Sequence, residues 1–199
     1  MYLQSIHIVN FRGIKDMTVH FNSKLNVIIG ANSHYKTTLI DAIRLFYTMG
    51  KQKRDIEITL NDFHVNRSVG DDGNVRYLSA SQIIIGYTFA GLSDDQKAAL
   101  YQYLVVGGSN ITAYAEINYT LDNKGKITLS YVTGKSMKAD YETFQYFKSY
   151  YLSALRDSTR DLQSTRNNPL GKVIKRKVNK SNHEEEIKGL LGLQQIIEF

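Results

Sequence analysis

Apolar and polar residues alternate along much of this chain, and this alternation predicts β-strands. It is strictest over 111–119, which is typical of a strand with one buried face. The turn sequence Asp-Asn-Lys-Gly at 122–125 then predicts a partner strand over 126–132. Apolar runs predict further strands over 2–10, 17–21, 25–29, 82–89 and 150–154. Three strands therefore precede the first helix, and an antiparallel meander follows it.

Helical spacing of apolar residues predicts a helix over 37–49, with Asp41 and Arg44 as a local i,i+3 pair. Ser93 and Gln96 form a capping-box pattern, which predicts a second helix from there to about 105. The chain from 184 onward also has a helical pattern. Residues 50–80 are polar and rich in Gly and Asp, and 70–74 predicts a loop.

A phosphate-binding pattern lies between the strand over 25–29 and the helix over 37–49. Gly30, Lys36 and Thr37 have the spacing of the pattern G-x-x-x-x-G-K-[ST]. In such a loop, successive backbone N–H groups form a nest for phosphate oxygens, and the helix N-terminus adds further donors. The lysine reaches the β- and γ-phosphates and the threonine hydroxyl holds Mg²⁺. The predicted ligands are therefore ATP and Mg²⁺, with Thr37 on the metal. The predicted nucleotide-binding residues of the loop are Gly30, Asn32, Ser33, Lys36, Thr37 and Thr38.

Tyr35 departs from this pattern, because it occupies the position of the second glycine. Glycine there lets the backbone approach the phosphates without a Cβ in the way. With tyrosine, the loop has to swing the ring outward or open slightly. Two interpretations follow: a nucleotide-binding ATPase, or a pseudo-ATPase scaffold that binds nucleotide weakly or not at all.

Composition limits the other classes of protein. The chain has 199 residues, 42% of them hydrophobic, which suits one domain with a sizeable core. It has no cysteine, so disulfide frameworks and thiolate metal sites are excluded. No apolar run approaches the roughly 18 residues of a membrane span, and the start of the chain has no secretory pattern. We therefore expect a soluble cytoplasmic protein without a membrane partner.

Positive charge is concentrated late in the chain. Residues 148–180 contain nine Lys or Arg and two Asp or Glu, while the net charge of the whole chain is +6. The candidate nucleic-acid-binding residues of this segment are Lys172, Lys175, Arg176, Lys177 and Lys180. Such a cluster fits the phosphate backbone of DNA. The alternative is a solvated face of a loop or helix.

The order of these motifs resembles the head of ABC-type ATPases of the RecF/SMC group. The resemblance rests on Ile6-His7-Ile8-Val9-Asn10-Phe11-Arg12-Gly13-Ile14, on Phe21 and on Asn26-Val27-Ile28-Ile29-Gly30-Ala31-Asn32. It implies an α/β fold, a P-loop ATPase head with a mixed sheet and an antiparallel meander. It also implies that Asn32 is the family asparagine and that Arg12 lies near the bound nucleotide. The alternative for Arg12 is a residue of a surface turn.

A second set of residues resembles the OLD (overcoming lysogenization defect) family. These are Leu60-Asn61-Asp62-Phe63, the segment over 151–162 with its Ala-Leu-Arg-Asp sequence, and Leu170-Gly171-Lys172. That resemblance implies an ATPase joined to a Toprim nuclease that acts on DNA in bacterial anti-phage defence, as an oligomer with defence-system partners. It also makes Asp62 a candidate for contact with Mg²⁺ or the γ-phosphate. The alternative for Asp62 is an aspartate that caps a turn.

Other motifs of such an enzyme are not found in the sequence. Phosphoryl transfer needs a carboxylate after an apolar strand to hold Mg²⁺ and orient water, and no apolar run ends in Asp-Glu. No Leu-Ser-Gly-Gly-Gln signature and no acidic nuclease cluster is present. We therefore interpret 1–199 as the N-terminal portion of a longer ATPase domain, without catalytic residues of its own. This portion alone is expected not to hydrolyse ATP. A DNA-repair ATPase of the RecF/SMC type is the alternative to the OLD nuclease.

Overall fold

The computed structural model describes residues 1–31, 35–48, 56–69, 73–107 and 110–134, together with Thr143, Tyr146, Phe147, Ser149 and Tyr151. All of the elements below lie in one compact unit, Met1–Lys148. A second unit, Ser149–Phe199, is described only at Ser149 and Tyr151. The strand predicted over 150–154 and the helix predicted from 184 lie outside the described residues.

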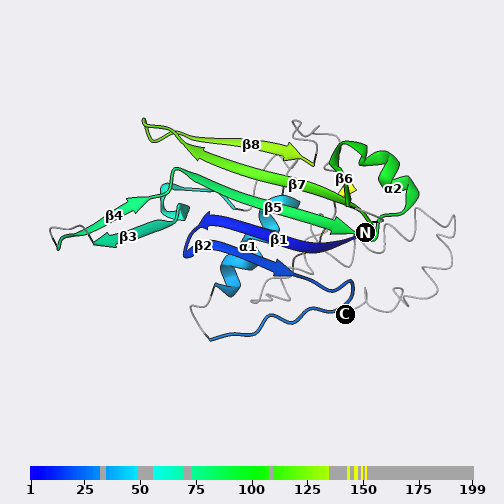
Figure 1. Ribbon diagram of the computed structural model, residues 1–199, viewed down its shortest axis with the longest axis horizontal. Helices are drawn as coiled ribbons and strands as arrows, with labels where there is room; N and C mark the ends of the chain where they lie inside the picture. Colours follow the sequence, from blue (N-terminus) through cyan, green and yellow to red (C-terminus); the bar gives the residue numbers. More distant parts are fainter. Residues whose placement is uncertain are drawn as a thin grey trace, which may run out of the picture. The chain divides into compact units, whose positions relative to one another are not determined.

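A six-stranded sheet forms the body of the first unit (Figure 1). Its strands are β1 (Tyr2–Phe11), β2 (Ile14–His20), β5 (Gln82–Ala90), β6 (Leu104–Gly107), β7 (Asn110–Leu121) and β8 (Ile127–Thr133). The order is β2-β1-β5-β7-β6, and β8 also pairs with β7. Each of these pairs is antiparallel. The predicted strands over 2–10, 82–89, 111–119 and 126–132 are confirmed, and that over 17–21 begins earlier, at Ile14.

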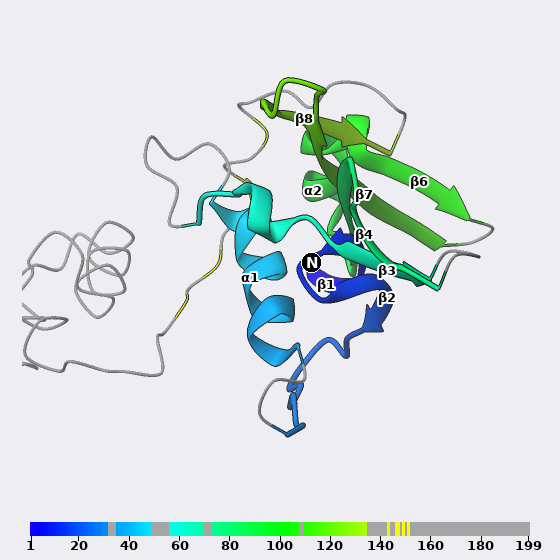
Figure 2. The ribbon, with the colours of Figure 1, turned by 90° about the vertical axis from the view of Figure 1, so that its left-hand side faces the viewer.

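Helix α1 (Lys36–Tyr47) covers one face of this sheet (Figure 2). The helix buries Leu39, Ala42, Leu45 and Phe46 against the sheet. The helix packs on Phe89 and Tyr87 of β5, with Phe46 ring centroids 5.3 Å and 4.6 Å from theirs. The Tyr87 hydroxyl donates to the Ala42 carbonyl at 2.6 Å, which satisfies a buried polar group and fixes the helix on the sheet.

The helix predicted over 93–105 is much shorter. Helix α2 (Asp94–Ala99) begins at the Ser93–Gln96 capping box, as predicted, but the chain then forms the 3₁₀ turn η2 (Tyr101–Tyr103) and strand β6. Leu100 and Tyr103 are buried, and Val105 and Val106 pair with β7. Tertiary pairing of these β-branched residues outweighs their weak helical pattern.

The prediction of a strand over 25–29 is wrong. This segment forms no strand, and the side chains of Leu25, Val27 and Ile29 are 80%, 73% and 87% exposed. A strand needs a neighbour for its backbone hydrogen bonds, and none of the described strands pairs with this segment. The parallel part of the predicted mixed sheet is therefore missing from the described residues.

Residues 56–69 and 73–80 hold structure that the sequence pattern did not predict. The 3₁₀ turn η1 (Leu60–Asp62) precedes a hairpin of β3 (Val65–Val69) and β4 (Val75–Ser79), which form a sheet of their own. The hairpin extends beyond the end of the main sheet (Figure 1). The predicted loop over 70–74 lies between β3 and β4. Its Gly73 has φ 73°, a left-handed conformation that glycine adopts readily. Among the described residues, no helix has the length and apolar character needed to cross a membrane.

Candidate phosphate-binding site

Lys36 is the first residue of α1, and its side chain folds back over the start of the loop. Its Nζ donates to the carbonyls of Gly30 and Ala31, each at 2.6 Å. Thr37 is exposed in the first turn and Thr38 is half-buried beside it. Asn32 and Ser33, also predicted to bind nucleotide, lie outside the described residues. Four of the six predicted loop residues, Gly30, Lys36, Thr37 and Thr38, are thus placed at one end of one helix.

The N-terminus of α1 has the properties of an anion-binding helix end. The side chain of its N-cap residue makes no capping hydrogen bond, and the first turn contains no acidic residue. The N–H groups of a first turn have no partner within their own helix, and they carry the positive end of the helix dipole. Together with the ammonium of Lys36, they suit a polyanion such as a phosphate chain.

Tyr35 is the N-cap residue of α1 and adopts the left-handed conformation, with φ 54° and ψ 5°. Its carbonyl accepts the hydrogen bond of Leu39 N at 2.8 Å, so the helix starts in the usual way despite the tyrosine. The ring lies against Gly13 in the turn between β1 and β2, where a Cβ atom on Gly13 would overlap Cε1 of the ring. Sequence reasoning identified Tyr35 as an obstacle, but did not identify Gly13 as its neighbour.

Arg12 lies next to Gly13 and joins three segments of the chain. Its Nε donates to Asp62 Oδ1 and its Nη1 donates to Asp41 Oδ2, both at 2.7 Å. Arg44 donates to the other oxygen of Asp41 at 3.1 Å, which confirms the predicted i,i+3 pair. Burial would lower the pKa of Arg12, but its bonds to Asp62 and Asp41 outweigh this effect and raise the pKa. The positive charge of Arg12 is therefore matched by two carboxylates, and the sequence pattern assigned neither of them to it.

The side chain of Asp62 caps the turn η1, of which it is the last residue. Its Oδ2 accepts hydrogen bonds from the Thr59 N–H at 2.8 Å and from the Thr59 hydroxyl at 3.0 Å. Burial would raise the pKa of Asp62, but the bonds from Arg12 and Thr59 outweigh this effect, so its pKa is lowered. Both carboxylate oxygens have donors, as expected of a turn-capping aspartate. Its role as a ligand of Mg²⁺ stays a prediction.

The backbone on either side of Arg12 is fixed to the same segment. Arg12 N donates to the Asp62 carbonyl at 2.7 Å, and the His64 ring nitrogen Nδ1 lies 2.8 Å from the Arg12 carbonyl. Phe11 and Phe63, both buried, form a bridge between β1 and this segment. The β1–β2 turn, α1 at Asp41 and residues 59–64 are therefore connected through Arg12. Within the described ranges, no group of three or more His, Cys, Asp or Glu side chains could hold a metal ion.

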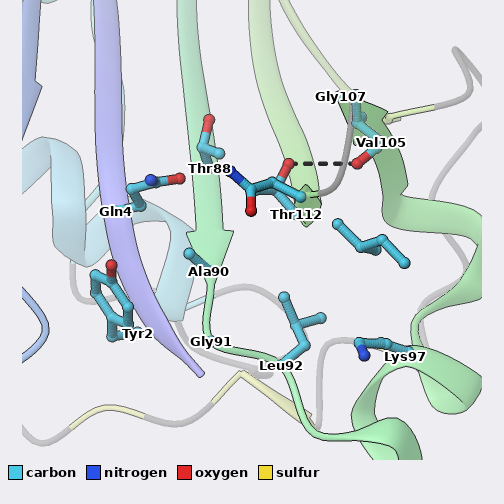
Figure 3. Close-up of a pocket in the computed structure, with 12 residues that line it drawn as sticks. Tyr2, Gln4, Thr88, Ala90, Gly91, Leu92, Lys97, Val105, Gly107 and Thr112 are labelled. Carbon is cyan, nitrogen blue, oxygen red and sulfur yellow. Dashed lines mark hydrogen bonds between the residues drawn. The ribbon is translucent and has the colours of Figure 1, made fainter.

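A shallow groove of about 640 Å³ lies at the other end of β1, away from Arg12. Gln4, Thr88 and Thr112 come from three neighbouring strands and line one side of it, as Figure 3 shows. Its lysine, Lys97, is paired with Asp94 at 2.8 Å. The groove is thus separate from the loop at the start of α1. The predicted DNA-binding residues Lys172, Lys175, Arg176, Lys177 and Lys180 lie outside the described residues.

Comparison with known proteins gives the family. The family model described as "AAA ATPase domain" matches residues 1–190. The chain belongs to this family. The match confirms the predicted class, an α/β ATPase domain, and the antiparallel meander is present in the sheet.

The curated relatives include RecF proteins. The chain is 46% identical over 43 residues to the DNA replication and repair protein RecF of Limosilactobacillus reuteri, which is 22% of this chain and 12% of that protein. It is 22% identical over 130 residues to RecF of Clostridioides difficile, 63% of this chain and 34% of that protein. The chain thus matches about a third or less of the length of these two relatives.

Solved structures give more distant matches. One, from a study of ATP-driven dimerization and DNA-stimulated activation of SMC ATPases, has a TM-score of 0.47 and 14% identity, and the match covers 87% of this chain and 96% of that one. A second, of the recombination mediator RecF with ATP, has a TM-score of 0.44 and 19% identity over 81% of this chain and 36% of that one.

Proposed function

We propose that this ATPase domain binds ATP with Mg²⁺ at the loop over 30–38. The observation that carries the proposal is the position of Lys36 on the first turn of an uncapped helix. Its ammonium is already held at the loop by two carbonyls, 2.6 Å away, so it is placed where phosphates would reach the helix N-terminus. Gly30, Asn32, Ser33, Thr37 and Thr38 would complete the phosphate cradle.

Mg²⁺ would be held first by the exposed hydroxyl of Thr37, next to Lys36. Asp62 is the second candidate ligand. Its two oxygens already accept bonds from Arg12 and Thr59, so a metal there would share them with these donors and lie near the Arg12 charge. Arg12 would lie beside the nucleotide while Asp41 and Asp62 hold two of its guanidinium N–H groups. Thr37 is therefore the stronger metal candidate of the two.

The wider role we propose is that of the ATP-binding head of an OLD-type, ATP-dependent DNA endonuclease in anti-phage defence. Nucleotide state would control a nuclease located elsewhere in an oligomeric protein, with defence-system subunits as further partners. The proposal rests on the Leu-Asn-Asp-Phe and Ala-Leu-Arg-Asp segments. The matches to RecF favour the second candidate, a DNA-repair ATPase of the RecF type.

The exposed apolar segment over 25–29 supports the proposal that 1–199 is one portion of a larger ATPase domain. Leu25, Val27 and Ile29 are each more than 70% exposed, and a group of apolar residues of this kind suits contact with a further part of the protein. A catalytic carboxylate, a signature motif and a nuclease would then lie in other parts of that larger protein.

Calorimetry on the full-length protein tests the binding proposal. We expect ATP to bind with Mg²⁺ and to bind more weakly in excess EDTA. Thr37→Ala should remove most of this difference, whereas Thr18→Ala, which changes an exposed threonine of β2, should leave it unchanged. A protein that binds no ATP under either condition would support the pseudo-ATPase scaffold instead. DNA cleavage that depends on ATP would separate the OLD-type role from the RecF-type one.

A further inference from the structure

We infer that Gly13 is a positioning residue for the phosphate-binding loop, because it provides the surface on which the Tyr35 ring rests. This inference builds on the proposed function, since it explains how a loop with tyrosine in place of glycine keeps Lys36 in position. Gly13 lies in the β1–β2 turn, 22 positions before Tyr35 in the sequence. No sequence motif links the two residues.

The backbone shows that Gly13 is not needed for its own conformation. The left-handed residues of this region are Asn10 with φ 58° and Arg12 with φ 52°, whereas Gly13 is outside the left-handed range. The φ of Gly13 therefore does not itself require glycine. At Tyr35 the situation is reversed: its φ of 54° suits glycine, yet the residue carries a large ring. Backbone conformation alone would thus favour glycine at position 35 and a residue with a side chain at position 13, which is the reverse of what the chain has.

Steric contact explains why position 13 has no side chain. A Cβ atom there would overlap Tyr35 Cε1, and it would also lie 3.0 Å from Cζ and 3.1 Å from Cδ1. The ring therefore fills the space that a side chain at position 13 would occupy. Tyr35 is 49% exposed, so its ring has free space on its other side. A methyl group at position 13 would then push the ring off the turn without damage to the core.

The turn under the ring is a rigid support. Arg12, the neighbour of Gly13, is bonded to Asp41 in α1 and to Asp62 in η1, each at 2.7 Å. The ring contact adds a second link between this turn and α1, at the residue directly before Lys36. With the ring on Gly13, the backbone of Tyr35 holds the start of α1 and Lys36 in the position described. A displaced ring would shift Tyr35 and, with it, the adjacent Lys36.

A double-mutant cycle on the full-length protein tests this inference. We expect Gly13→Ala to weaken MgATP binding by about tenfold, equivalent to about 1.4 kcal/mol. In the Tyr35→Gly background the same substitution should have less than about a twofold effect, since no ring remains to be displaced. Gly107→Ala is the matched control, because a Cβ at Gly107 meets no atom within 4 Å and its φ is also outside the left-handed range.

A second readout makes the result independent of ATP. A 3-fluorotyrosine at position 35 reports the surroundings of the ring by ¹⁹F NMR, and Gly13→Ala should shift its signal while Gly107→Ala should not. If the signal moves but wild-type protein binds no MgATP, the position of the ring stands and the proposed function fails. If MgATP binds, the ¹⁹F signal stays in place and the two substitutions have additive effects on affinity, the inference about Gly13 is overturned and the nucleotide site stands.

Discussion

Arg12 donates its Nε–H to Asp62 Oδ1 at 2.7 Å, although the two residues are 50 positions apart in the sequence. The same guanidinium bonds Asp41 of α1, and the Arg12 N–H and carbonyl also bond residues of the 59–64 segment. Arg12 thus connects the β1–β2 turn, the helix that carries Lys36 and the turn η1.

Replacement of this arginine should destabilise the protein. Arg12→Ala leaves Asp41 and Asp62, whose side chains are 15% and 12% exposed, without their shared cation. Hydrogen bonds to charged groups contribute about 1.5–3 kcal/mol each. Asp41 keeps its bond from Arg44, and solvent screens the partly exposed Arg12 side chain, so we expect the free energy of unfolding to fall by less than the sum of two bonds, about 2–3 kcal/mol. Urea unfolding monitored by circular dichroism measures the change.

Arg12→Lys is the matched variant, because it keeps the charge but loses the planar fork that reaches two carboxylates at once. Its stability should lie between those of the wild type and Arg12→Ala. Equal urea midpoints for all three proteins would mean that the network contributes nothing to stability.

Acid should weaken the same network through Asp62. The folded-state pKa of Asp62 is lowered, so its contribution to stability is fully present above its unfolded pKa of about 3.9 and is lost as the pH falls through the folded value. We expect Asp62→Asn to be less stable at neutral pH and to lose less stability than wild type between about pH 5 and pH 2.

Unfolding free energies measured across that range give the comparison. Asp95→Asn, which changes an exposed aspartate of α2, is the control and should follow the wild-type curve. Parallel curves for wild type and Asp62→Asn would show that this carboxylate has the same pKa in both states, contrary to the hydrogen bonds that we describe.

Comparison with the fold shows which sequence patterns are sufficient to predict a helix or a strand. The alternation along β7 and the capping box of α2 are both local signals, so each element could be predicted from its own residues. The segment over 25–29 is as apolar as a strand, but strand formation depends on a neighbour that sequence pattern does not provide. At residues 104–107 the sequence predicts a helix, but the structure has strand β6, because these residues pair with β7.

The candidate site was predictable to a similar degree. Lys36, Thr37 and the start of α1 follow from a contiguous motif, and the family match agrees with it. The contacts of Arg12 with Asp62 and of Tyr35 with Gly13 join distant parts of the chain. Arg12 and Asp62 were candidates from a resemblance, but their partners depend on how the turn and the helix pack together. Only the tertiary structure gives that relation.

The basic segment provides a separate prediction about DNA. If Lys175, Arg176 and Lys177 contact phosphates, changing all three to alanine should weaken DNA binding for any sequence. The slope of log affinity against log salt should fall by roughly one unit for each lost contact. The control removes the same charge from three exposed lysines elsewhere, Lys15, Lys24 and Lys124. A slope that changes equally in both triple variants would assign the effect to net charge rather than to a binding site.

The central claim is that Lys36 and the start of α1 bind the phosphates of ATP. Calorimetric titration of MgATP into the full-length protein and its Lys36→Ala variant tests it most directly, with Lys15→Ala of β2 as a folded control of equal charge. The Lys36 side chain is bonded only to two loop carbonyls among the described contacts, so its removal should leave the circular dichroism spectrum unchanged. We predict that wild type and Lys15→Ala bind MgATP and that Lys36→Ala binds it at least about a hundredfold more weakly. This factor is what the loss of two charged hydrogen bonds from the Lys36 ammonium to phosphate oxygens would produce. Equal affinity in wild type and a folded Lys36→Ala variant would contradict the account.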